Sequence, residues 1–145
     1  MAVLKNRAKM STSTTGTGTI TLGSAESGYQ TFSDAGVANA DVVRYVIEDG
    51  TAWEIGTGTY TATGTTLTRT VSESSNADAA IVLTGSAVVF VGATAEDILQ
   101  PANNLSDLAN AGTARTNLGL GTAATSAATD FVAVTGDTMT GNLSF

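Results

Sequence analysis

The chain has 145 residues, of which 42% are hydrophobic and only 13% are charged, which suits one ordinary domain or a small domain with an extension. It contains neither cysteine nor histidine, which excludes disulfides, the usual zinc sites and histidine-based nucleophile–base pairs and leaves only a site made of carboxylates. The net charge is −7, but residues 11–145 carry three basic residues against all 13 acidic ones, and we expect this acidic body to repel nucleic acid.

The first ten residues, MAVLKNRAKM, form a basic head in which apolar side chains alternate with cations. The pattern predicts an extended arm that lies in a partner's groove, and the alternative is a disordered, solubilising end. The head shows no signal-peptide pattern, because no long apolar run follows it. The longest apolar run, residues 87–91, is too short to cross a membrane, and we expect the protein to be made in a cytoplasm.

Residues 11–93 carry the turn residues and alternating patterns of an antiparallel β domain, beginning with a Thr-rich strand over 11–23. The clearest signal is DVVRYVIEDGTAWEIGTG, residues 41–58, where two apolar runs flank Gly50. A three-residue loop with Gly50 at the bulge position pairs Tyr45 with Trp53, whereas a two-residue Asp-Gly turn pairs Tyr45 with Glu54 and splits the apolar set. We choose the bulged loop, which predicts a core of Val43, Tyr45, Ile47, Trp53 and Ile55.

Two further hairpins are predicted after this one. Residues 58–74 turn at Thr63-Gly64, and residues 80–92 turn at Thr84-Gly85-Ser86. Turns every 8–15 residues without strand–helix alternation indicate an antiparallel β-sandwich or a small barrel.

The period of the sequence changes at Thr94. Asp97 follows three residues later, which approximates a capping box, and Pro101 ends the helix quickly. Residues 94–102 are therefore predicted to be a short helix and hinge.

The segment NNLSDLANAGTARTNLGL, residues 103–120, predicts two short helical pieces. Gly112 ends the first piece, and the second runs from Ala114 to Leu118, with Thr113 as its cap and Gly119 closing it. Both pieces are too short to be stable alone. Three chains around one axis would bury their apolar side chains, so we predict a trimer interface made of Leu105, Leu108, Leu118 and Leu120.

These residues also carry a resemblance to a known family. NNLSDLANAGTARTNLGLGTAAT resembles a segment that recurs in bacteriophage tail fibre proteins, and VTGDTMTGNLSF, residues 134–145, is similar to a motif that often follows it. The stretch from TGTGTITLG to VFVGATAEDIL, residues 15–99, resembles an N-terminal β domain of tailed phages. The resemblance covers nearly the whole chain.

The resemblance implies a virion structural protein, the proximal part of a homotrimeric tail fibre that is anchored to the tail. Residues 103–145 would form the trimeric fibre linker and the start of the shaft. The partners would be tail proteins of the adaptor, nozzle or hub type. Host receptors would be bound only by a distal part that this chain lacks, since the chain stops inside a motif that normally continues. Docking on the tail is predicted for six residues of the head: Val3, Leu4, Lys5, Arg7, Lys9 and Met10.

This interpretation gives the protein no enzymatic activity, no cofactor, no membrane contact and no nucleic-acid partner. One alternative is a stand-alone carbohydrate-binding or capsid-decorating β-sandwich, which predicts a monomer; in this alternative Tyr45 and Trp53 form a sugar-stacking platform instead of core contacts. Another is a fibre-borne depolymerase with its catalytic groups beyond Phe145.

Two weaker site hypotheses rest on carboxylates. Asp41, Glu48 and Asp49 supply the oxygen ligands that calcium prefers, but the spacing is not that of an EF-hand loop, and solvent-exposed turn residues are the preferred interpretation. Asp137, near two threonines, is the candidate for a hydrolytic group.

Overall fold

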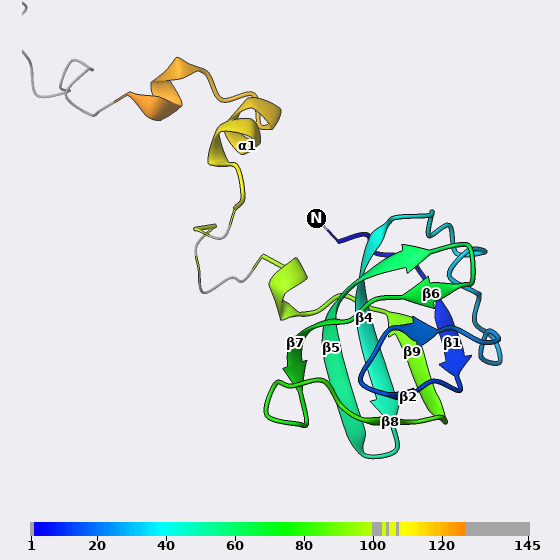
Figure 1. Ribbon diagram of the computed structural model, residues 1–145. Coiled ribbons are helices and arrows are strands. Elements are labelled where there is room, and N and C mark those ends of the chain that lie inside the picture. The colour runs from blue at the N-terminus through cyan, green and yellow to red at the C-terminus, as the bar shows by residue number, and fades with distance from the viewer. Residues whose placement is uncertain (1, 100–102, 104, 107, 127–145) are drawn as a thin grey trace, which may run out of the picture. The chain divides into compact units, whose positions relative to one another are not determined.

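The computed structural model describes residues 2–99, 103, 105–106 and 108–126. The chain divides into two compact units (Figure 1), residues 1–98, here called the β unit, and residues 99–145, here called the C-terminal unit. The β unit contains nine strands: β1 (Lys9–Thr12), β2 (Thr15–Gly16), β3 (Ile20–Thr21), β4 (Val42–Asp49), β5 (Ala52–Thr61), β6 (Thr66–Leu67), β7 (Thr70–Ser74), β8 (Leu83–Thr84) and β9 (Ala87–Val91).

Seven of these strands form one antiparallel sheet that curls into a half-barrel. Its order is β1-β9-β4-β5-β6-β3, and β7 also pairs with β5, while β2 and β8 form a separate pair. The mainly β fold class is thereby confirmed. The concave side encloses the core, whose largest fully buried side chains are Tyr45, Phe32, Met10, Ile20, Ile47, Leu67 and Leu83.

The register of the β4–β5 hairpin differs from both predicted registers. Asp49 pairs with Ala52, so the loop is Gly50-Thr51, and Gly50 has the positive φ of 63° that the first position of a type II′ turn requires. Trp53 therefore lies opposite Glu48 and Tyr45 lies opposite Gly56. A shift of register by one residue reverses the faces of a strand.

The predicted core is consequently right on one strand and wrong on the other. Val43, Tyr45 and Ile47 are fully buried, whereas Trp53 is 39% exposed and Ile55 is half-buried. Glu54 takes the inward position in their place. Pairing with Arg69 makes that burial possible, as described below.

The hairpin over residues 58–74 forms with its turn near Gly64, since Tyr60 pairs with Leu67. The hairpin predicted over residues 80–92 is wrong. β8 pairs with β2, whereas β9 lies between β1 and β4. Asp49 holds β8 in its place, because its carboxylate accepts hydrogen bonds from the Thr84 N–H at 2.6 Å and the Thr84 hydroxyl at 2.7 Å.

The first ten residues are part of the β unit and not a separate arm. Val3 forms a bridge with Val43, β1 begins at Lys9, and Ala8 and Met10 are buried in the core. The boundary predicted between residues 10 and 11 is therefore wrong. Met10 is unavailable for docking, because its side chain is only 2% exposed.

The helical elements are shorter than typical helices. η1 (Ala95–Asp97) is a single 3-10 turn, and the Thr94 N–H donates to the Asp97 carboxylate at 3.1 Å, so the predicted capping contact is confirmed. The hinge residue Pro101 lies outside the described residues.

In the C-terminal unit, α1 (Ala111–Asn117) precedes η3 (Thr122–Thr125). Gly112 lies inside α1 and does not end a helix, because Asn110 starts this helix by accepting a hydrogen bond from the Thr113 N–H at 2.8 Å. Gly119 closes it with φ of 70°, as predicted.

Candidate interaction surface

The side chains of β1, β9, β4 and β5 that point away from the core make up what we call the outer face of the sheet. The strand register aligns them in two rows across the four strands. The first row is Lys9, Phe90, Val46 and Ile55, and the second is Ser11, Val88, Glu48 and Trp53. All eight are half-buried or exposed, whereas their neighbours along each strand are mostly buried.

This face is unusually apolar for a sheet surface. In an antiparallel sheet with one face on the core, the other face is normally polar. Here Val46, Ile55, Val88, Phe90 and Trp53 supply five apolar side chains in two adjacent rows. Contiguous apolar patches on soluble proteins commonly mark interaction sites.

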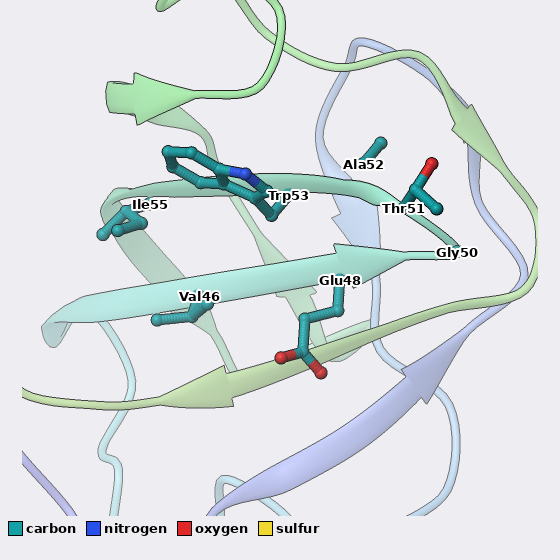
Figure 2. A pocket seen from close by; sticks show the side chains of 7 residues that line it. All are labelled: Val46, Glu48, Gly50, Thr51, Ala52, Trp53 and Ile55. Atoms are coloured by element: carbon teal, nitrogen blue, oxygen red, sulfur yellow. The ribbon is translucent and has the colours of Figure 1, made fainter.

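An open hollow of about 540 Å³ lies at the hairpin end of the outer face. Figure 2 shows the Trp53 indole beside Ile55 on β5, with Val46 and Glu48 on the neighbouring strand β4. Gly50, Thr51 and Ala52 complete its wall. Its polar side chains are Glu48 and Thr51, so the hollow offers mainly apolar contact.

The charges on the outer face are paired. Lys9 Nζ lies 3.4 Å from Glu48 Oε2 and 4.8 Å from the centre of the Phe90 ring. Arg44, which lies next to this surface on β4, forms two bonds with Asp97 of η1, at 3.0 Å from Nε and 3.2 Å from Nη2. These hydrogen bonds from Arg44, opposed by partial burial, lower the pKa of Asp97.

A third ion pair, between Glu54 and Arg69, lies in the interior of the β unit. The Glu54 carboxylate accepts hydrogen bonds from the Tyr45 hydroxyl at 2.7 Å, from the Ile81 N–H at 3.0 Å and from Arg69 Nε at 2.9 Å, and Arg69 Nη2 contacts its other oxygen. Arg69 also donates to the carbonyls of Gly16 and Ile81. Across the described residues, no buried side-chain nitrogen or oxygen lacks a hydrogen-bond partner.

These contacts set the protonation states. Burial alone raises the pKa of Glu54, but the hydrogen bonds from Arg69, Tyr45 and Ile81 outweigh it and hold that pKa below its ordinary value. Burial, with the bond to the Glu54 carboxylate, raises the pKa of Tyr45 far above its ordinary value. The network therefore consists of the Glu54 anion, the Arg69 cation and the neutral Tyr45 phenol. These groups bond to one another inside the core and are not available to a ligand.

Sequence reasoning missed this network, although a signal was present. Glu54 is followed at alternate positions by Gly56 and Gly58. Small residues on the inward side of a strand leave room for large neighbours, here Tyr45 and Leu67. An inward-facing glutamate in such a row needs an inward-facing cation, and Arg69 is the next basic residue along the chain.

The residues predicted for docking are dispersed. Arg7 donates to the Gly28 carbonyl through Nε at 3.0 Å, and its guanidinium lies 4.8 Å from the centre of the Tyr29 ring. Leu4 is exposed and Lys5 half-buried, whereas Val3 is tied to β4 by a hydrogen bond from its N–H to the Val42 carbonyl at 2.7 Å. Lys9 belongs to the outer face.

Three of the four predicted interface leucines are exposed. Leu105, Leu118 and Leu120 are 60%, 74% and 52% exposed, and Leu108 is half-buried. Neither α1 nor η3 contains a buried residue.

The calcium and hydrolytic hypotheses find no assembled site. Asp49 is buried against Thr84 and is not a solvent-exposed turn residue as predicted, and Asp137 lies outside the described residues. In the described part of the chain no three carboxylates gather as a metal site would require. None of the helices described there has the length and apolar character that crossing a bilayer requires.

Comparison with known proteins finds no matching family model, no matching curated protein and no matching solved structure.

Proposed function

We propose that this chain is a virion structural protein, the proximal part of a homotrimeric phage tail fibre. The β unit anchors the fibre to a tail protein of the adaptor, nozzle or hub type. Residues 103–145 join three chains, and a distal region binds the host receptor. The sequence resemblance of residues 103–126 and 134–145 to tail fibre segments is the starting point of the proposal.

The exposure of the leucines is the observation that carries the proposal. A seven-residue helix is too short to be stable alone, and α1 buries none of its own side chains. Leucines at 52–74% exposure leave apolar area in water, and three copies around one axis cover it. These exposed leucines support assembly of the C-terminal unit with other copies of the chain.

Docking on the tail fits the exposed part of the N-terminal segment. Leu4 and Arg7 are exposed and Lys5 is half-buried, and the exposed Tyr29 ring lies beside Arg7. Deleting residues 1–10 is a poor test, because it removes part of β1 and of the core. The substitution Lys5→Glu tests docking without that damage.

The oligomeric state tests the proposal. By light scattering, we expect the full chain to be a trimer and the double variant Leu118→Ser/Leu120→Ser to be a monomer. The control, Val82→Ser, changes an equally exposed apolar residue of the β unit and should remain a trimer. A monomeric full chain would contradict the proposal.

A second candidate, a carbohydrate-binding module, is favoured by the exposed Trp53 in its hollow with Glu48 and Thr51. An exposed indole offers a flat apolar surface with a polar edge, which suits a sugar ring. This candidate predicts a monomer whose tryptophan fluorescence changes with added glycans.

A further inference from the structure

We infer that the outer face of the sheet is a second self-association surface, at which β units of separate copies pack against one another. The inference rests on the proposed function, because residues 103–145 are what holds the three copies together. It adds a surface, made by Val46, Ile55, Val88, Phe90 and Trp53, to the leucines of the C-terminal unit.

The apolar character of the face selects a protein partner over a sugar. The two rows place five apolar side chains over three neighbouring strands, β9, β4 and β5. Strands lie about 4.8 Å apart, so the patch is about 10 Å wide across the strands, wider than one sugar ring. Saccharides also need several hydrogen-bonding groups, and the hollow offers Glu48 and Thr51.

The charge distribution selects another copy of this chain as the partner. Two acidic bodies repel each other unless they meet at a near-neutral surface, and residues 11–145 carry a large excess of acids. On the outer face Lys9 is paired with Glu48, and beside it Arg44 is paired with Asp97. Glu73 of β7, opposite Ile55, adds a negative charge at the margin of the face. Lys9 of one copy can also pair with Glu48 of the next, so the face is complementary to itself.

Because the C-terminal segments join the copies, even weak contacts between the outer faces are enough to hold the β units together. Six residues lie between Ile98 and Leu105, and the seven steps along the chain span at most roughly 25 Å when fully extended. β units attached to one trimeric axis by so short a connection experience an effective concentration of about millimolar. Contacts too weak to hold free β units together therefore form within the assembly.

Trp53 is the only tryptophan of the chain, so its fluorescence reports directly on this face. The test compares acrylamide quenching of Trp53 in the full chain and in two variants with the same substitution, Val88→Lys and Val82→Lys. Val88 lies on the outer face, about 10 Å or two strands from Trp53, whereas Val82 is an exposed residue outside it. Circular dichroism verifies that both variants fold, and light scattering gives their mass.

We expect Val88→Lys to raise the quenching constant about threefold, because a buried lysine would separate the packed faces. The Val82→Lys variant should match the wild type, and both should remain trimers. A trimer in which Trp53 is quenched equally in all three proteins would overturn the inference and leave the proposed function standing. A monomeric wild type would overturn both. A glycan-induced change in Trp53 fluorescence would overturn the inference in favour of a sugar site.

Discussion

The Arg69 guanidinium bonds to groups in the interior of the β unit, namely the Glu54 carboxylate and two main-chain carbonyls. Its side chain and that of Glu54 are almost completely removed from water. A buried pair of this kind adds little stability over apolar residues of the same size, but removal of one partner leaves a charge buried without compensation. Arg69 and Glu54 therefore stabilise the fold only as a pair.

We predict that Arg69→Met lowers the free energy of unfolding by about 3–5 kcal/mol. Urea unfolding followed by circular dichroism measures the change. The control is Lys9→Met, which breaks the exposed pair with Glu48 and should cost less than about 1 kcal/mol. Equal losses in the two variants would show that the buried network has no special role.

At the scale of elements, two glycines let strand β5 accept neighbours on its inner side. A Cβ on Gly56 would lie 2.6 Å from the Tyr45 hydroxyl, and a Cβ on Gly58 would lie 2.9 Å from Leu67 and press on the Thr68 carbonyl. The Thr-Gly repeat of this strand is thus a packing requirement, because β6, β7 and Tyr45 occupy the space that side chains would fill.

We predict that Gly58→Ala destabilises the β unit by about 2 kcal/mol or more, since the neighbouring atoms include main chain that cannot move aside. Gly18→Ala is the matched control. Apart from its neighbours in the chain, no residue lies within 4 Å of the added methyl, and the change should be neutral within about 0.5 kcal/mol. Thermal unfolding of both variants distinguishes packing from a general effect of losing glycine.

The sequence patterns predicted the strand content, the hairpins around Gly50 and Gly64 and the helix closure at Gly119, but not the register of β4 and β5 or the partners of β8 and β9. Residue alternation shows that β5 has two faces and does not show which face is inward. The face of β5 that turns inward is the one that carries Glu54. Burial of Glu54 is possible because Arg69, which directly precedes β7 and follows Glu54 by fifteen residues, pairs with its carboxylate. The candidate surface was missed for the same reason, since the register of the predicted bulged loop placed Trp53 in the core beside Tyr45.

For the whole molecule, the two lowered carboxyl pKa values determine how stability depends on pH. Glu54 and Asp97 have folded-state pKa values below their ordinary ones of about 4.5 and 3.8. A lowered pKa adds stability that is complete above the ordinary value and is lost as the pH falls through the folded value. Without histidine, no side chain titrates ordinarily between pH 5 and 8.

We therefore predict a constant free energy of unfolding from about pH 5.5 to 8 and a decline below about pH 4.5. Urea titrations at a series of pH values measure it. Asp97→Asn should reduce the slope on the acid side, and Glu73→Gln, an exposed carboxylate of β7, serves as the control. A maximum near neutral pH with a fall on both sides would contradict the prediction.

The N-terminal segment and the residue that follows β9 both bond to the beginning of strand β4. The Val3 N–H donates to the Val42 carbonyl at 2.7 Å, and the Gly92 N–H donates to the Arg44 carbonyl at 3.3 Å. A pulling force applied between these two points would peel β1 and β9 apart one hydrogen bond at a time, which is the direction in which antiparallel strands resist least. In the fibre that we propose, a base held by its N-terminal segment alone would open under tension. A base whose copies contact one another through the outer face of the sheet would transmit the tension to the neighbouring copies, and the β1–β9 pair would remain intact.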